Sequence, residues 1–220
     1  WLKTNVAEIS AYNTVKGFLN LSFSNVYWNG LFAQIAGAEN YGQLAPTGRT
    51  IMVEYSSPNT NKPLHLGHIR NNLLGWSVAK LLEVCGHNVL KVNLVNDRGI
   101  HICKSMYAWK VLGNGETPAS SGKKGDHLVG DYYVAFNNLY KKEVDELVAG
   151  GMSKEEAEKN APSLKAAQEM LFKWENGDAE VVELWKTMNG WVYEGFDKTY
   201  NDLGINFDRT YYESQTYRFG

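Results

Sequence analysis

The chain contains 220 residues, of which 44% are hydrophobic and 21% are charged, and its formal net charge is −2. A chain of this length can bury a sizeable core, either as one large domain or as two smaller ones. No apolar run approaches the roughly 18 residues of a membrane span, and nothing resembles a secretory signal. The two cysteines, Cys85 and Cys103, are too few for a disulfide framework, which favours a reducing, cytoplasmic setting without membrane association.

Charge is unevenly distributed along the chain. Residues 49–110 contain eight lysines and arginines against three acidic residues, whereas residues 131–213 contain nine against seventeen. A local excess of positive charge is what an anion-binding site requires. The acidic part is explained equally well as a solvated helix surface, and it suits nucleic acid poorly.

The first 48 residues predict the end of a small domain. "GFLNLSF" alternates apolar and small polar residues, which indicates a strand. The glycines, proline and threonine of residues 42–48 indicate a linker. Because the chain begins with Trp1 rather than methionine, we interpret residues 1–48 as the tail of a preceding α+β domain.

The next segments predict a βαβ unit. "TIMVEY", residues 50–55, is typical of a buried strand, and "NVLKVNLV", residues 88–95, of a second one. Between them, a turn-rich run leads into a helix from His68 whose apolar residues share one face. These residues are Ile69, Leu73, Trp76, Leu81 and Cys85. A right-handed crossover onto a parallel sheet is the default for this order, so we predict an α/β fold.

The rest of the chain, a little over half of it, is predicted to be mostly helical. A helix over residues 100–112 is followed by a long loop, "GNGETPASSGKKGDH", and the next helix resumes at Leu128. "SKEE" at residues 153–156 is a capping box, Pro162 begins a further helix, and Asp178 caps a long one. "INFDRTYYES" returns to an extended pattern. The helically spaced tryptophans Trp174, Trp185 and Trp191 are predicted to lie in the core.

Two histidines, His65 and His68, stand at the start of the first long helix. A zinc site needs three or four ligands, and the neighbouring histidines and cysteines show no paired spacing, so a metal is disfavoured. Simple packing would explain an isolated HxxH pattern. Here, however, a strand and a turn precede "HLGH", and a helix N-terminus in that position binds anions. Gly67 leaves room for a nucleotide, and the two imidazoles could stabilise a phosphate that gains charge, without a protein nucleophile.

The run "VEYSSPNTNKPLHLGHIRNNLLG" resembles the signature of the class I aminoacyl-tRNA synthetases, and specifically that of the arginyl-tRNA synthetases. In that family V-E-[FY]-S-[SA]-P-N-x-x-K-x-x-H-x-G-H-[LI]-R is highly specific. "NDRGIHICKSMYAWK", "ENGDAEVVELWK", "FDKTYNDLGINFD" and "YYESQTY" resemble later segments. The resemblance covers nearly the whole chain and is weakest across residues 112–165. It implies a Rossmann-like, doubly wound parallel sheet, of which this chain holds the first half, with a helical insertion.

The resemblance also implies a domain organisation. Residues 1–48 correspond to the tail of an N-terminal domain that contacts tRNA, together with a linker. Residues 49–220 correspond to the N-terminal part of the catalytic domain, with an insertion at about residues 113–152. The second signature of the class, KMSKS, and the anticodon-binding domain do not occur in the sequence. We therefore expect a fragment that is inactive by itself.

Individual roles follow from matching positions. His65 and His68 match the catalytic histidines, which bind ATP and stabilise charge at its α-phosphate. The residues matched to ATP binding are Pro58, Lys62, His65, Gly67 and His68. The residues matched to arginine binding are Glu54, Ser57, Asn59 and Glu213. Among the alternatives, Glu54 could be a solvated strand-end charge, Asn59 could form an Asx turn, and Glu213 follows Tyr212 where the family usually has glycine.

The function implied by the resemblance is ATP-dependent activation of L-arginine to arginyl-adenylate, followed by transfer to tRNA(Arg). ATP would enter as its Mg²⁺ complex, with no tightly bound metal, and the protein would be monomeric. Two alternatives stay open: another HxGH nucleotidyltransferase, and a non-catalytic paralogue that binds tRNA. "SSPN" and "NDRG" argue against the first, and the presence of both histidines argues against the second.

Overall fold

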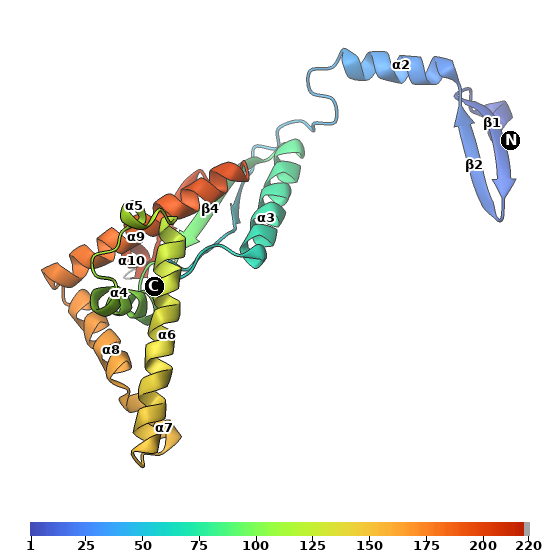
Figure 1. Cartoon of the computed structure of the whole chain (residues 1–220). Coiled ribbons are helices and arrows are strands. Elements are labelled where there is room, and N and C mark those ends of the chain that lie inside the picture. The colour runs from blue at the N-terminus through green and yellow to red at the C-terminus, as the bar shows by residue number, and fades with distance from the viewer. Residues whose placement is uncertain (218–220) are drawn as a thin grey trace. The chain divides into compact units, whose positions relative to one another are not determined.

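The computed structural model describes residues 1–217, which form two compact units (Figure 1). One unit comprises residues 1–46 with 84–86, and the other comprises the rest of the described chain. In the first unit, α1 (Leu2–Asn5) precedes an antiparallel hairpin of β1 (Ile9–Val15) and β2 (Phe18–Phe23), and α2 (Asn25–Ala36) follows. The strand predicted from "GFLNLSF" is confirmed as β2, whereas its partner β1 was not predicted.

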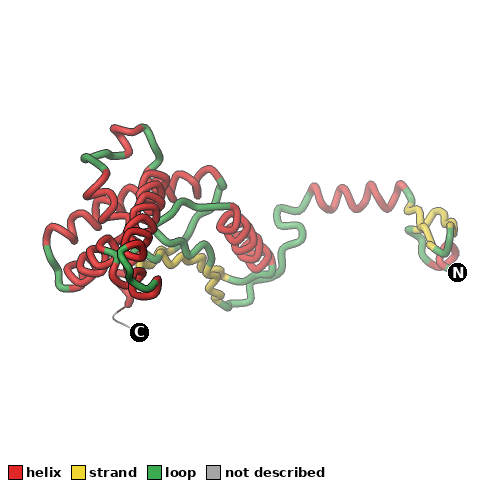
Figure 2. Tube along the Cα trace, turned by 60° about the horizontal axis from the view of Figure 1, so that its bottom comes forward, coloured by secondary structure: helices red, strands yellow, loops and turns green. Residues whose placement is uncertain are grey.

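The second unit is built on a three-stranded parallel sheet. Its strands, drawn in yellow in Figure 2, are β3 (Thr50–Glu54), β4 (Asn88–Val95) and β5 (Arg209–Tyr212), and they pair in the order β3-β4-β5. The helix α3 (Leu66–Val84) connects β3 to β4, which confirms the predicted parallel βαβ unit. Because all three strands run the same way, their carboxyl ends lie at one edge of the sheet, where α/β domains bind their ligands.

Two predictions about this unit are wrong. The strand β3 is not buried, since Met52 is 59% exposed; within residues 1–217 this strand pairs only with β4. The helix α3 begins at Leu66 rather than His68, and two residues of its expected apolar face, Leu73 and Leu81, are exposed.

The buried face of α3 consists of small and polar residues. Asn72 and Ala79 are fully buried, and they lie on the same side of the helix as Gly75, about one turn before it and one turn after it. A Cβ atom at Gly75 would lie 2.3 Å from Cγ of Tyr55. The helix therefore packs closely against Tyr55 through residues that carry no hydrophobic signal, and this is why the sequence pattern indicated the wrong face.

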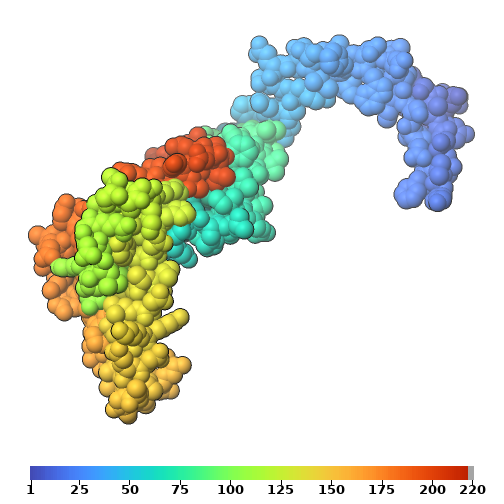
Figure 3. Space-filling view, in the orientation of Figure 1, coloured from blue at the N-terminus to red at the C-terminus, as the bar shows by residue number. Residues whose placement is uncertain are grey.

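Helices make up the rest of this unit. The long ones are α4 (Ile100–Leu112), α6 (Gly125–Ala149), α8 (Pro162–Glu175) and α9 (Ala179–Asp202), and the short ones are α5 (Pro118–Ser121), α7 (Lys154–Asn160) and α10 (Glu213–Thr216). Figure 3 shows α6 in yellow-green along the length of the helical part. The helices enclose a core that includes Met106, Val129, Met188, Val192 and Phe196. The tryptophans Trp174, Trp185 and Trp191 pack against this core, as predicted.

The predicted helix starts are largely confirmed. The Ser153 hydroxyl accepts a hydrogen bond from the Glu156 N–H, the Asp178 carboxylate accepts one from the Val181 N–H, and Pro162 is the first residue of α8. The predicted loop before α6 is shorter than expected. It contains α5, and α6 begins at Gly125, three residues before the predicted start.

The first residue of α6 packs closely against α9. A Cβ atom at Gly125 would lie 2.0 Å from the backbone oxygen of Trp191 in α9, so the first turn of α6 approaches α9 only because residue 125 is glycine. We expect Gly125→Ala to lower the free energy of unfolding by about 2–3 kcal/mol, as overpacking does. Urea unfolding monitored by tryptophan fluorescence measures this loss.

The matched control is Gly190→Ala, in the interior of α9. A Cβ atom there meets nothing within 4 Å, so alanine should raise stability by up to about 1 kcal/mol through its helix propensity. Equal effects of the two substitutions would contradict the packing argument.

Candidate active site

The histidine pair lies where β3 has ended and α3 begins. The His65 carbonyl accepts hydrogen bonds from the N–H groups of His68 (2.8 Å) and Ile69 (3.1 Å), so His65 opens the first turn of the helix. The two imidazole centroids are 4.0 Å apart. The sequence therefore brings both rings to an exposed helix N-terminus at the carboxyl edge of the sheet.

Backbone hydrogen bonds fix which nitrogen of each ring carries the proton. The N–H of His65 donates to Nδ1 of His68 (3.2 Å), and the N–H of Gly67 donates to Nδ1 of His65 (3.1 Å). A neutral imidazole that accepts at Nδ1 carries its hydrogen on Nε2. Both rings can therefore present an Nε2–H donor to an anion.

Local electrostatics favour the neutral form of His68. Burial lowers the pKa of His68 below its ordinary value of 6.5, and electrostatic interaction with His65 and Lys62 lowers it further. Burial, Lys104 and Lys62 also lower the pKa of His101. Lys62 thus lies within electrostatic reach of two histidines from different helices, and it supplies positive charge beside the pair.

Glycine at position 67 affects the position of the His65 ring, in addition to leaving room for a ligand. A Cβ atom at this position would lie 3.0 Å from Cε1 and 3.1 Å from Nδ1 of His65. A side chain here would push the His65 ring away from the backbone N–H that orients it. Glycine therefore lets the His65 ring lie closer to the backbone than a residue with a side chain would.

The segment between β3 and the histidines is held against the end of β4. The carbonyl of Pro58 accepts a hydrogen bond from the Asn96 N–H (2.9 Å), and the Thr60 N–H donates to the Asn96 carbonyl (3.2 Å). Asn59 forms an isolated parallel bridge with Asn96, and its side chain is exposed. Pro58 is buried and Lys62 is half-buried.

Glu54 and Ser57 are brought together at the end of β3. The Ser57 hydroxyl donates to Oε1 of Glu54 at 3.2 Å. A pocket of about 320 Å³ opens beside them and is lined partly by Glu54, Arg70 and Asn71. The carboxylate and the serine oxygen can both accept hydrogen bonds, so this pair suits a cationic group such as an ammonium.

Glu213, the last of the residues matched to arginine binding, lies apart from the first three along the sheet. It follows Tyr212 directly and begins α10, whereas Glu54 ends β3. In the order β3-β4-β5 these two strands are separated by β4, a spacing of about 10 Å at the usual strand separation. Tyr212, where the family usually has glycine, packs its ring on Tyr193 with centroids 5.0 Å apart.

Sequence reasoning missed Asp97, which organises the neighbourhood of Glu213. Its carboxylate is 1% exposed and accepts hydrogen bonds from the Ser214 N–H (2.8 Å), the Ser214 hydroxyl (2.7 Å) and the Tyr193 hydroxyl (2.8 Å). Its carbonyl accepts from the indole of Trp185 (2.7 Å). The only available signal was an aspartate at the carboxyl end of a predicted strand.

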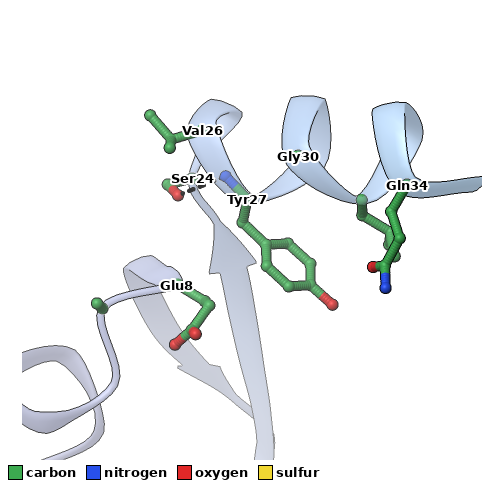
Figure 4. Close-up of a pocket in the computed structure, with 8 residues that line it drawn as sticks. Glu8, Ser24, Val26, Tyr27, Gly30 and Gln34 are labelled. Carbon is green, nitrogen blue, oxygen red and sulfur yellow. Dashed lines mark hydrogen bonds between the residues drawn. The ribbon is translucent and has the colours of Figure 1, made fainter. Parts of the chain in front are cut away.

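A second pocket, of about 630 Å³, lies in the first unit (Figure 4). Tyr27 and Gln34 extend from the same side of α2, and Glu8 comes from the segment before β1. Glu8 is the one carboxylate among the residues that line this pocket, and these residues include no histidine or cysteine. The histidine pair and the Glu54–Ser57 pair therefore lie at the carboxyl edge of the sheet and not in this larger pocket.

Residues 1–217 contain no cluster of three or more histidine, cysteine, aspartate or glutamate side chains suited to hold a metal ion. None of the helices in this part of the chain combines the length and the apolar character needed to cross a membrane.

A parallel sheet with histidines at the first strand-to-helix turn defines a Rossmann-like nucleotide-binding domain of the HxGH class. Residues 32–218 match the sequence model of a family described as "tRNA synthetases class I (R), catalytic domain". The chain belongs to this family, in which R is the one-letter code of arginine.

Similar proteins agree with this assignment. A protein of Bacteroides thetaiotaomicron named arginine–tRNA ligase is 57% identical over 222 residues, and one of the same name from Amoebophilus asiaticus is 56% identical over 220. Each match covers 100% of this chain and 37% of the relative, so the chain spans little more than a third of their length.

Solved structures show the same fold. The structure of the Thermus thermophilus arginyl-tRNA synthetase superimposes with a TM-score of 0.55 at 20% identity, covering 94% of this chain and 30% of that one. A Campylobacter jejuni structure, titled a putative arginyl-tRNA synthetase, gives a TM-score of 0.52 at 18% identity, covering 89% and 38%.

Proposed function

We propose that the protein containing this chain is an arginine–tRNA ligase. It activates L-arginine with ATP to form arginyl-adenylate and pyrophosphate, and it then transfers the arginyl group to tRNA(Arg). The observation that carries the proposal is the family match over residues 32–218, within which His65 and His68 occupy the N-terminus of α3. ATP enters as its Mg²⁺ complex, as substrate.

In the first step, a carboxylate oxygen of arginine attacks the α-phosphorus of ATP. The bond from that phosphorus to the bridging oxygen breaks, and pyrophosphate leaves with the electron pair. The Nε2–H groups of His65 and His68 donate to phosphate oxygens as charge develops on them, which is the electrostatic form of catalysis. Lys62 adds positive charge, and Pro58 and Gly67 belong to the same ATP-binding segment.

The amino acid is held at the neighbouring strand ends. Glu54, Ser57 and Asn59 hold the α-ammonium group, for which the Glu54–Ser57 pair provides oxygen acceptors. Glu213 accepts from the guanidinium group, whose planar donor fork suits a carboxylate. In the second step, a hydroxyl of the terminal adenosine of tRNA attacks the carbonyl carbon, and AMP leaves.

The parts of the chain serve this reaction as follows. Residues 1–48 form the tail and linker of a domain that contacts tRNA, and residues 49–220 form the first part of the catalytic domain, with the insertion at about 113–152. The protein acts as a cytoplasmic monomer without a resident metal. Another HxGH nucleotidyltransferase and a non-catalytic tRNA-binding paralogue are the competing functions; the names of the curated relatives favour neither.

The test is amino-acid-dependent exchange of labelled pyrophosphate into ATP by the complete purified protein, with its tRNA present. We expect exchange with arginine and with none of the other nineteen amino acids. Exchange with another amino acid would point to a different synthetase, and no exchange with any would favour the non-catalytic paralogue. Residues 1–220 alone should show no exchange, and activity of this segment would contradict the assignment of essential residues outside it.

A further inference from the structure

The turn that follows β3 contains two adjacent residues in a conformation that serine rarely adopts. Ser56 has a φ of 78° and Ser57 a φ of 46°. For residues with a side chain, positive φ brings Cβ close to the following carbonyl oxygen, so each such residue is strained. Strain of this kind persists only where surrounding contacts enforce it, and it is concentrated at functional sites.

Side chains from three different elements hold this turn. Asn71 of α3 accepts a hydrogen bond from the Ser56 N–H through Oδ1 (2.9 Å). Asn93 of β4 accepts one from the Ser57 N–H through Oδ1 (3.1 Å). Tyr200 of α9 shares a hydrogen bond of 2.6 Å with the Ser56 hydroxyl. Both strained backbone N–H groups therefore have a side-chain acceptor.

The contacts of Asn93 and Tyr200 close into one buried network, and the exposed Asn71 adds a further acceptor at its rim. The Asn93 amide also donates to the Tyr200 hydroxyl at 3.5 Å, which links the two serines through a second route. Ser56, Asn93 and Tyr200 are 4%, 1% and 6% exposed. A hydrogen bond in such a site is costly to remove, because the group left behind has no water to replace the lost partner.

We propose that Asn71, Asn93 and Tyr200 are positioning residues that hold the strained Ser56–Ser57 turn, and thereby set the position of the arginine-binding groups on either side of it. The turn lies between Glu54 and Asn59, and the Ser57 hydroxyl itself contacts Glu54. If the turn relaxed, the chain would leave β3 in another direction and these acceptors would separate. This inference rests on the proposed function, and it adds three residues that act through the turn.

The test measures steady-state pyrophosphate exchange by the complete protein, with KM for arginine and KM for ATP determined separately. Asn71→Ala should raise KM for arginine by about tenfold, the factor that corresponds to about 1.4 kcal/mol, while KM for ATP changes less than about twofold. Tyr200→Phe, which removes only the hydroxyl, should raise KM for arginine in the same direction. A merely structural role would lower the amount of active protein and would leave KM for arginine unchanged.

A rescue variant separates positioning from other effects. Asn71→Asp keeps an acceptor oxygen on an exposed residue and should recover most of the wild-type KM for arginine. The matched control is Asn88→Ala, at the other end of β4. Asn88 is exposed, and its side-chain amide donates a hydrogen bond to the Thr50 hydroxyl.

Each outcome decides the question. Raised KM for arginine in Asn71→Ala, with recovery in Asn71→Asp, supports the proposal. An unchanged KM in both Asn71→Ala and Tyr200→Phe, or an Asn71→Asp variant whose KM is as high as that of Asn71→Ala, overturns it, while arginine-dependent exchange by the wild type leaves the proposed function standing. Absence of arginine-dependent exchange in the wild type overturns the proposed function instead.

Discussion

Replacing Asp97 by alanine should lower the free energy of unfolding by about 3–4 kcal/mol, among the larger effects expected of one substitution. The carboxylate is buried and accepts three hydrogen bonds, two from Ser214 and one from the Tyr193 hydroxyl. Alanine leaves all three donors, which belong to half-buried residues, without their acceptor. Burial and the charge of Asp97 raise the pKa of Tyr193, so the phenol keeps its proton and stays a donor at all ordinary pH values.

Asp97→Asn should cost less, about 1–2 kcal/mol. Its remaining oxygen can accept from the Ser214 N–H, and its NH₂ group can face the two hydroxyls, which are able to reverse their roles and accept. The matched control is Asp208→Ala, a carboxylate beside the same sheet that accepts from the Lys91 N–H (2.7 Å) and is 43% exposed in its side chain. We expect a loss of about 1 kcal/mol there.

Urea unfolding measures these differences, and hydrogen exchange localises them. The Ser214 amide should exchange faster in Asp97→Ala, because it loses its acceptor, while amides of α6 keep their rates relative to global unfolding. If Asp97→Asn lowered the free energy of unfolding as much as Asp97→Ala, Asp97 would not hold this turn. Unchanged protection of the Ser214 amide in Asp97→Ala would lead to the same conclusion.

Local signals predicted most of the fold. Strand β4 and helix α4 have the predicted bounds, and the starts of α8 and α9 were indicated by Pro162 and Asp178, because capping residues and proline act within one turn of a helix. The inner face of α3 was not predictable in this way. It depends on Gly75 meeting Tyr55, a contact between two elements, and not on the periodicity of apolar residues within one.

The candidate site was predictable as a set of residues and not as a geometry. The resemblance supplied His65, His68 and the residues matched to arginine binding, and the structure describes where they lie, while their roles stay proposals. Asp97 and Ser214 are 117 positions apart, and no local pattern links them. The positive φ of Ser56 and Ser57 is equally invisible in the sequence, since serine rarely adopts it and only the surrounding asparagines and tyrosine enforce it.

Replacing His68 by alanine in the complete protein should lower kcat for adenylate formation by about 100-fold, the usual loss when one preorganised donor to a developing oxyanion is removed. The effect should fall on kcat more than on KM for arginine, because the donor acts on phosphate charge that develops in the transition state. His68→Gln places an amide N–H near the position of Nε2 and should lose only about tenfold.

The matched control is His87→Ala. This histidine contacts the Thr47 hydroxyl through Nδ1 (2.8 Å) and precedes the first residue of β4, at the opposite edge of the sheet from the pair. Its removal should change kcat less than about twofold, an effect within the range of neutral surface substitutions. A His68→Ala variant that keeps its kcat, or that loses only affinity for arginine, would remove His68 from the phosphate-binding role.

The pH dependence has a defined sign. Because the pKa of His68 is lowered on folding, the unfolded chain binds a proton more readily than the folded one between the folded value and 6.5. The stability contributed by neutral His68 is therefore fully present above pH 6.5 and is lost as pH falls through its folded pKa. Protonation of Nδ1 would also break the hydrogen bond from the His65 N–H, so adenylate formation should decline over the same window. NMR titration of the ring locates the midpoint, and a value at or above 6.5 would contradict the neutral donor pair.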